Sequence, residues 1–206
     1  AVVEIDAPET PIMDGSAREY VKKIAEAALT EQDADIVYYE VPDRVKFTVP
    51  DKGVEIEIFP DDRFSVSVHI DYNSKVLGNQ YATYEPGDDF ATKIAPCRTF
   101  VFLHELEPLL NLNLIKGGDL DNAIVIVEKD MSDDEADHIA KLYDKKDIKV
   151  RRGYLNNLEL RFVNEPARHQ LHDVLGDVTL LGLRIKGRLI ATRPGHAANT
   201  ETVKLL

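Results

Sequence analysis

Three side chains that can bind a metal ion or carry a proton recur at every fourth position near the carboxyl end of the sequence. They are His169, Asp173 and Asp177. On an α-helix each step of four residues turns the side chain by only about 40°, so all three project from one side. Residues four apart on a helix have Cβ atoms about 6 Å apart, and zinc binds imidazole nitrogen and carboxylate oxygen at about 2 Å. His169 and Asp173 are therefore candidate zinc ligands, and Asp177 is a candidate for orienting a neighbouring group.

The surrounding sequence predicts the helix that this spacing requires, over residues 165–181. Apolar residues recur there at helical spacing, which gives the helix one face for a core and leaves the other face polar. They are Leu171, Val174, Leu175, Val178 and Leu181. A solvated polar face with no chemical role would show the same pattern.

A second histidine lies at a predicted strand-to-helix turn. His196 belongs to the segment 193–199, and the ends of loops are where catalytic groups tend to lie. An ordinary exposed loop histidine is the alternative. Residues 96–100 place a hydroxyl and an aromatic ring, Thr99 and Phe100, at the start of a strand.

Alternating apolar and polar residues predict short strands through much of the first half, separated by turns rich in Pro, Gly, Asp and Asn. The expected strands are 36–41, 45–49, 54–59, 64–71 and 81–85. Before them, residues 2–5 resemble the end of a strand, and Ser16–Glu19 has the capping-box pattern of a helix that reaches about residue 29. Because residues 30–35 are polar, we expect a linker there and a domain boundary near residue 33.

The second half alternates between helices and strands. We expect helices at 90–95, 104–114, 132–143, 165–181 and 195–206, and strands at 98–102, 122–127, 158–163 and 184–192. The strand, helix and strand between 98 and 127 indicate a small crossover unit. The fold class is therefore α+β, with helices on a sheet and a strand-helix-strand insert.

Composition excludes several classes of function. The net charge of −12 argues against nucleic acid or an anionic membrane surface as the main partner. One cysteine, Cys97, allows no intrachain disulfide and fits a reducing cytoplasm. No apolar run approaches the roughly 20 residues that span a bilayer, and no secretory signal is visible, so we expect a soluble cytoplasmic protein. Nucleotide-binding glycine loops and a Gly-x-Ser-x-Gly elbow are also absent from the sequence.

Several short motifs together resemble one family, the zinc-dependent UDP-3-O-acyl-N-acetylglucosamine deacetylases of lipid A biosynthesis. Their order and approximate spacing agree from residue 2 to residue 206. The motifs are Pro11–Ala17, Ile70–Tyr72, Gly78 with Gln80, Ala95–Phe100, Gly117–Gly118, Leu120–Ala123, Asn164–His169, and Gly195–His196 with Asn199.

The resemblance implies a role for each candidate residue. His169 and Asp173 match two of the three protein zinc ligands, and Asp177 matches the carboxylate that positions the acid, which His196 matches. Thr99 matches a hydroxyl that helps hold the developing oxyanion, and Phe100 matches an aromatic near the glucosamine ring. The implied substrate is UDP-3-O-acyl-N-acetylglucosamine, and the implied fold has two similar α+β domains. Residues 1–33 are then the remnant of an amino-terminal domain, and residues 34–206 form the carboxy-terminal domain.

The sequence also departs from the family pattern. The motif His-Thr-x-Glu-His, which supplies the third zinc ligand and the general base, does not occur in it and is expected upstream of Val2. The resemblance therefore implies that this chain alone is inactive without the missing amino-terminal domain. Gln170 stands where a Lys near the substrate diphosphate is common, Pro194 replaces a small polar residue, and residues 131–157 are longer than expected.

Two other interpretations remain at this point. The polar face of residues 165–181 would dock a partner in a non-catalytic module, which should gain nothing from zinc. A different zinc hydrolase would need a third ligand within this chain, and His172 is the obvious candidate. On an ideal helix, however, His172 lies about 60° around from the midpoint of His169 and Asp173.

Overall fold

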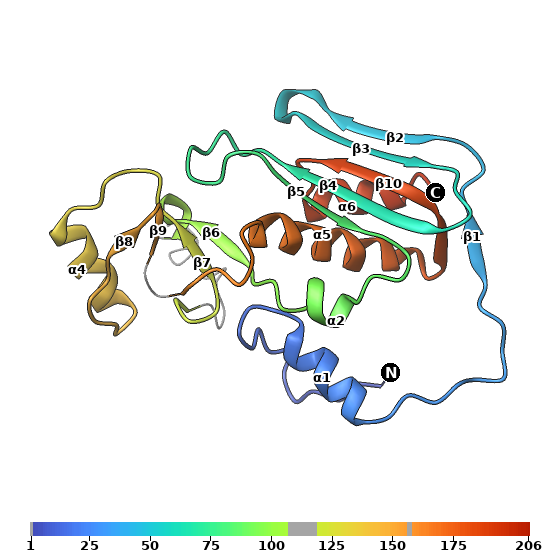
Figure 1. The fold of residues 1–206 in the computed structure, drawn as a ribbon, viewed down its shortest axis with the longest axis horizontal. Coiled ribbons are helices and arrows are strands. Elements are labelled where there is room, and N and C mark those ends of the chain that lie inside the picture. The colour runs from blue at the N-terminus through green and yellow to red at the C-terminus, as the bar shows by residue number, and fades with distance from the viewer. Residues whose placement is uncertain (1, 107–118, 156–157) are drawn as a thin grey trace.

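The main body of the protein is a mixed β-sheet with two helices on one face. The computed structural model of the chain describes residues 2–106, 119–155 and 158–206 (Figure 1). The sheet has the order β2-β3-β10-β4-β5, and β1 pairs in parallel with the first part of β10. Its strands are β1 (Tyr38–Glu40), β2 (Val45–Val49), β3 (Val54–Phe59), β4 (Phe64–Ile70), β5 (Gln80–Tyr84) and β10 (Arg184–Thr192). The expected strands are thus confirmed to within a few residues.

The last strand of the chain occupies the middle of this sheet. β10 runs antiparallel to β3, with Leu189 opposite Ile58, and parallel to β4, with Leu189 opposite Val66. All three side chains are buried, as their alternation with polar neighbours predicts. A strand from the carboxyl end therefore joins two strands that follow each other in the sequence.

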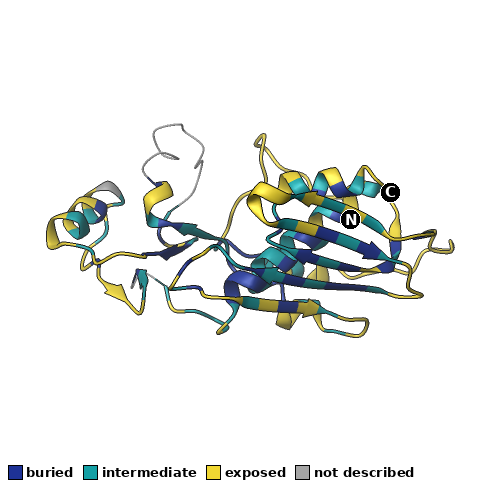
Figure 2. Cartoon of the chain, turned by 90° about the horizontal axis from the view of Figure 1, so that it is seen from above, coloured by how far each residue is buried: buried dark blue, intermediate teal, exposed yellow. Residues whose placement is uncertain are grey.

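Two helices cover the inner face of the sheet. Helix α5 (Glu165–Val178) contacts β4 and β5, helix α6 (His196–Val203) contacts β2 and β3, and the two helices contact each other. Leu171 and Val174 are fully buried in this core. Figure 2 shows the buried residues of the sheet and its helices in dark blue. The predicted helix over 165–181 is confirmed up to Val178, after which Thr179–Leu181 forms a 3-10 turn that ends at Gly182.

A smaller sheet lies beyond the amino end of α5 (Figure 1). It has the order β6-β7-β9-β8, formed by Phe100–Phe102, Ile124–Ile126, Tyr154–Leu155 and Val150–Arg151. β6 and β7 are parallel, as the predicted crossover requires. Residues 103–106 are helical, and the rest of the helix predicted over 104–114 lies outside the described residues, as does the Gly117–Gly118 motif. The insert thus contains two strands, β8 and β9, that the sequence did not predict. Each has only two residues, which is too short to show an alternation of apolar and polar residues.

Two further helices, α4 and α2, lie outside the pair that covers the main sheet. Helix α4 (Asp133–Leu142) packs in the insert and begins with the predicted capping box, in which Ser132 accepts from the backbone N–H of Glu135. Helix α2 (Phe90–Lys93) begins at Asp89, whose side chain accepts from the N–H of Ala91. The predicted helix at 90–95 is therefore confirmed in shortened form.

Two predicted strands are wrong. Residues 2–5 are not in a strand, and Val2 is 92% exposed, since no described segment pairs with them. Residues 158–160 have no regular structure, and residues 161–163 form bends and a turn instead of a strand. There the carbonyl of Glu159 accepts from Arg98, and the N–H of Arg161 donates to Glu165, so side chains take the backbone groups that a neighbouring strand would have used.

The first helix is also shorter and capped differently than predicted. Helix α1 (Arg18–Glu26) starts after Ala17 without a side-chain cap, so the capping box is wrong. The Ser16 hydroxyl instead donates to Asp14 at 2.6 Å, and this Asp14–Ser16 turn replaces the box. No residue of α1, all of which the structure describes, is buried.

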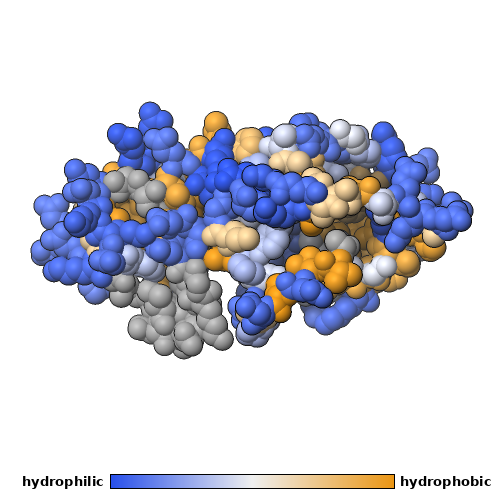
Figure 3. Space-filling model, turned by 90° about the horizontal axis from the view of Figure 1, so that it is seen from below, coloured by the Kyte–Doolittle hydropathy of each residue, from blue (hydrophilic) through white to orange (hydrophobic). Residues whose placement is uncertain are grey.

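Apolar side chains are exposed around α1. Val2, Val3, Met13, Ile24 and Leu29 line part of a groove of about 520 Å³ beside the helix. Figure 3 views the molecule from this side and shows apolar patches among hydrophilic residues. Within the described residues, no helix is both long and apolar enough to span a membrane.

The hairpin of the insert packs closely against the loop after β4. Gly153 lies at the turn between β8 and β9 with φ +82°, and its carbonyl accepts from the N–H of Val127 at 2.7 Å. A Cβ atom at this position would lie 2.5 Å from both γ-carbons of Val76. Gly87 has a similar φ of +93° but no atom within 4 Å of such a Cβ, so it is a matched control.

We therefore predict that Gly153→Ala lowers the free energy of unfolding more than Gly87→Ala does. Both changes strain a left-handed backbone by about 1–2 kcal/mol, and the contact with Val76 adds about 1–3 kcal/mol of overpacking. Urea denaturation measures the free energy of unfolding of both variants. Adding Val76→Ala to Gly153→Ala should relieve part of the difference. Equal losses in the two glycine variants would show that the hairpin does not press on Val76.

Candidate functional site

The first turn of α5 is held by a buried ion pair. Glu165 is fully buried, and its carboxylate accepts from Arg98 Nε at 2.9 Å and from Arg98 Nη2 at 3.1 Å. It also accepts from the backbone N–H groups of Arg98 at 3.0 Å and Arg161 at 2.6 Å. These four hydrogen bonds compensate the burial of the charge and tie α5 to the segment that leads into β6.

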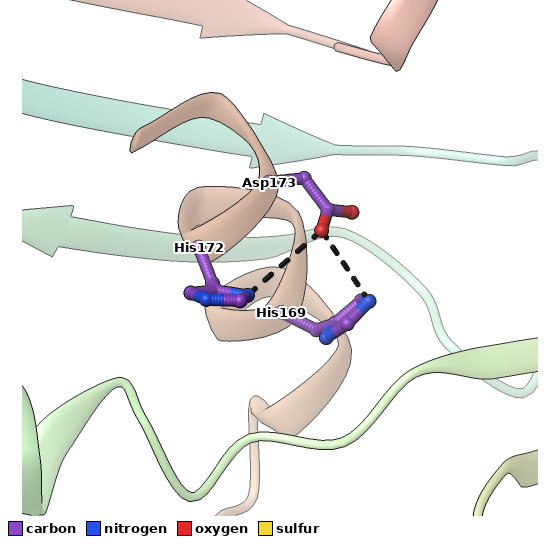
Figure 4. Close-up of side chains that lie close together, drawn as sticks. All are labelled: His169, His172 and Asp173. Atoms are coloured by element: carbon purple, nitrogen blue, oxygen red, sulfur yellow. Dashed lines mark ion pairs between the residues drawn. The ribbon is translucent and has the colours of Figure 1, made fainter. Parts of the chain in front are cut away.

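This tie brings His169 against the backbone at Cys97. His169 Nδ1 lies 3.3 Å from the Cys97 carbonyl oxygen, which can only accept, so Nδ1 carries the hydrogen. In the neutral imidazole Nε2 then has a free lone pair, and it lies 3.5 Å from Asp173 Oδ1. The predicted pair does converge, as Figure 4 shows.

His172 joins this pair. Its Nδ1 lies 3.9 Å from Asp173 Oδ1, and one ligand atom from each of His169, His172 and Asp173 lies within 4.8 Å of the others. On an ideal helix His172 lies about 60° from the midpoint of His169 and Asp173, but its imidazole ring reaches across that angle. Burial, and then a positive charge on His169, lower the pKa of His172 and outweigh the charge of Asp173, so the neutral imidazole is favoured.

The donor set fits zinc. Ligand atoms at about 2.0–2.1 Å in a tetrahedron are about 3.3 Å apart, close to the 3.5 Å between His169 and Asp173. The other oxygen of Asp173 accepts from Gln170 Nε2 at 3.3 Å, which holds the carboxylate in place. His169, with its Nδ1 on a carbonyl, has the partner that metal-binding histidines usually have.

Asp177 and His196 form a second pair, one turn further along α5. His196 Nδ1 lies 2.9 Å from Asp177 Oδ2, and Asn199 Nδ2 donates to the same oxygen at 2.8 Å. Partial burial lowers the pKa of His196, but the hydrogen bond to Asp177 and the charges of Asp173 and Asp177 outweigh it, so the pKa is raised. A raised pKa favours the protonated imidazole, the form that can act as an acid.

Thr99 and Phe100 lie at the start of β6, where Phe100 contacts His169. The Thr99 N–H donates to the Gly15 carbonyl at 2.9 Å, and the Phe100 ring meets His169 edge to face with centroids 6.3 Å apart. Gly15 has φ +80°, and a Cβ there would lie 1.8 Å from the carbonyl oxygen of Asn122. Glycine is therefore required where residues 11–17 pass the start of β6.

Tyr72 was not singled out as a site residue from the sequence. Its ring lies edge to face with Phe100 and with Phe102, at 5.8 Å in each case. Burial, with the charges of Asp173 and Glu105, raises the pKa of Tyr72 to about 12. The sequence signal that could have identified Tyr72 is its membership of the Ile70–Tyr72 motif, which follows β4.

Cys97 offers no nucleophile. It is buried, and burial together with the charge of Glu165 raises the pKa of its thiol to about 12. Burial and Glu165 outweigh the opposing charges of Arg168, Arg161 and Arg98, so the thiol is protonated at physiological pH.

Comparison with known proteins gives consistent matches. The family model described as UDP-3-O-acyl N-acetylglycosamine deacetylase matches residues 1–140 and 146–206, and the interruption lies within residues 131–157. The chain is 46% identical over 206 residues to the bifunctional enzyme LpxC/FabZ of Porphyromonas gingivalis, covering all of this chain and 45% of that protein. It is 41% identical to the bifunctional enzyme of Chlorobaculum tepidum, covering 99% and 44%. It is 35% identical to a UDP-3-O-acyl-N-acetylglucosamine deacetylase of Nostoc, covering 95% and 63%.

We predict that Asp177→Asn lowers the pKa of His196, because the amide keeps a polar contact but removes the charge. NMR titration of the imidazole measures this, with Asp137→Asn on α4 as the control. Because the pKa of His196 is raised on folding, its proton stabilises the fold below the ordinary value of 6.5 and ceases to do so as pH rises through the folded-state pKa. An unchanged pKa of His196 in Asp177→Asn would show that the charge of Asp177 does not raise it.

Proposed function

Since the chain belongs to the UDP-3-O-acyl-N-acetylglucosamine deacetylase family, we propose that it carries most of a zinc site that removes the N-acetyl group of UDP-3-O-acyl-N-acetylglucosamine in lipid A biosynthesis. One observation carries the proposal. A single helix presents the His169–Asp173 pair and, one turn on, the carboxylate that holds His196. A metal-binding pair beside a positioned acid is one arrangement that can hydrolyse an amide.

Each residue has a distinct task in this proposal. His169 and Asp173 would hold zinc, which would supply polarisation of the amide carbonyl and a lowered pKa of water. Because Nδ1 of His196 faces Asp177, its Nε2–H is free to donate a proton to the leaving amine. Asp177 stabilises that proton, and Asn199 holds the carboxylate of Asp177.

Thr99 and Phe100 take the substrate side of the site. Thr99 precedes β6, and its backbone N–H bonds Gly15, so the residue has a fixed position from which its hydroxyl can donate to the developing oxyanion. Phe100 is held between His169 and Tyr72, which suits a ring that packs against a sugar. Gln170, at the position after the ligand, binds Asp173 here, so we assign it no contact with the diphosphate.

We further propose that the third zinc ligand and the general base come from sequence outside residues 1–206. The chain spans less than half the length of the bifunctional relatives that it matches, at 45% and 44%. Within it, the exposed apolar residues around α1 support the assignment of residues 1–33 to an amino-terminal domain and of residues 34–206 to the site-bearing domain. A cytoplasmic location, with its reducing conditions, suits the single free Cys97.

The metal pair is tested in a protein that joins residues 1–206 to an amino-terminal domain containing His-Thr-x-Glu-His. His169→Ala and Asp173→Ala should each lower the bound zinc and abolish turnover, because each removes a ligand. His69→Ala is the control, since this histidine lies on β4 and stacks on Tyr81 with centroids 4.5 Å apart. Full zinc content in either ligand variant would overturn the assignment.

Residues 1–206 alone should not deacetylate the substrate. Loss of the general base removes about 10²- to 10⁴-fold of the rate even with zinc supplied. The assay uses UDP-3-O-acyl-N-acetylglucosamine and excess zinc, with and without a separately made amino-terminal domain. Efficient turnover by residues 1–206 alone would show that the base lies within them.

A further inference from the structure

The pair formed by Asp177 and His196 has a third member that lies inside the molecule. Asn199 is on α6, as His196 is, and its side chain reaches Asp177 on α5. The exposed fraction falls inward along this series, from 72% for the His196 side chain through 16% for the Asp177 side chain to 2% for Asn199. Asn199 is therefore out of reach of a substrate that enters from solvent, and it can act on the reaction only through its neighbours.

The side-chain amide of Asn199 is oriented by Asp177. A carboxylate accepts hydrogen bonds, so the amide nitrogen faces it, and Nδ2 lies 2.8 Å from Asp177 Oδ2. The amide oxygen, Oδ1, is buried and has no hydrogen-bond partner among the residues that the structure describes. Within that part of the chain, Asp177 is thus the one partner of this buried amide.

A buried amide with an unpaired oxygen lowers the stability of a fold, because the oxygen has lost its hydrogen bonds to water. An apolar side chain of similar shape would avoid that loss. The neighbours of Asn199 on the helix would suit one, since Ala198 and Val203 pack against the main core. The amide at this position therefore indicates a role other than stability.

We propose that Asn199 is a positioning residue for proton transfer, which holds Asp177 against Nδ1 of His196 and so keeps Nε2 of His196 free for the leaving amine. The inference rests on the proposed function, in which His196 is the acid. It adds that the buried amide serves the orientation of His196 and not the stability of the fold.

The contacts of Asp177 support this assignment. Among the described residues its carboxylate has two hydrogen-bond partners, His196 and Asn199. Because the His196 side chain is largely exposed, Asn199 supplies the contact on the inner side. Without that contact the carboxylate is free to turn toward solvent, and Nδ1 of His196 loses its fixed partner.

The first experiment compares the stability of two variants of residues 1–206 by urea denaturation. Asn199→Leu keeps a branched side chain without polar atoms, whereas Asn199→Ala leaves a cavity. We expect an unchanged or higher urea midpoint for Asn199→Leu and a lower one for Asn199→Ala. Thr202→Val is the matched control, since Thr202 is also 2% exposed on α6 but its hydroxyl donates to the Ala198 carbonyl of its own helix.

The same proteins are then compared by ¹⁵N NMR of the His196 ring, at a pH at which the ring is neutral. In the unmodified chain and in Thr202→Val the hydrogen should be on Nδ1, because Nδ1 faces a fixed carboxylate. In both Asn199 variants the share of the Nδ1–H form should fall, although their stabilities differ. An unchanged tautomer in Asn199→Leu would overturn the inference, as would a loss of stability in that variant equal to the loss in Asn199→Ala.

The second experiment measures turnover in the protein that joins residues 1–206 to an amino-terminal domain. Both Asn199 variants should lower kcat about 10-fold, the lower end of the loss usual for groups that support a metal site from outside, and should leave KM unchanged. Thr202→Val should change neither constant. An unchanged kcat in Asn199→Leu would contradict the inference alone. Full turnover in His196→Ala would instead contradict the proposed function, while the tautomer and the stability would still decide what Asn199 does.

Discussion

The buried Arg98–Glu165 ion pair is the interaction on which the site depends. Glu165 is the first residue of α5 and Arg98 precedes Thr99, so one contact sets the distance between the helix that carries the candidate ligands and the strand that faces them. Removing one partner of such a pair leaves a buried charge and costs about 3–5 kcal/mol. The pair therefore serves to fix position, because well-packed apolar residues would serve stability as well.

Further polar contacts extend this junction to the amino end of the chain. Arg161 donates to Asp14 at 2.6 Å and to the Pro96 carbonyl at 2.7 Å, and its own N–H donates to Glu165. Gly15 then passes Asn122 at a distance that allows no side chain. Four motifs that are far apart in the sequence meet at this junction: Pro11–Ala17, Ala95–Phe100, Leu120–Ala123 and Asn164–His169.

One face of helix α5 packs on the sheet, and another face carries the candidate site residues. Leu171 and Val174 are buried against the sheet, while Asp173 and Asp177 face away from it toward the candidate metal and proton sites. A rigid helix held by a sheet on one side gives the ligands the fixed positions that metal sites need. Tyr72, after β4, packs on Phe100 and Phe102 and so connects the core of the main sheet with that of the insert.

The sequence by itself determined the strands at 45–49, 54–59 and 184–192, the helix from Glu165, and the convergence of His169 with Asp173. All of these follow from periodicity, which is a property of neighbouring residues. Only the tertiary structure decided that β10 lies between β3 and β4, that residues 158–163 bend around Arg98, and that Gly15 must be glycine. It also decided that His172 turns toward His169 and Asp173. These four features depend on contacts between distant parts of the chain or on the reach of a side chain, and the spacing of neighbouring residues carries no information about either.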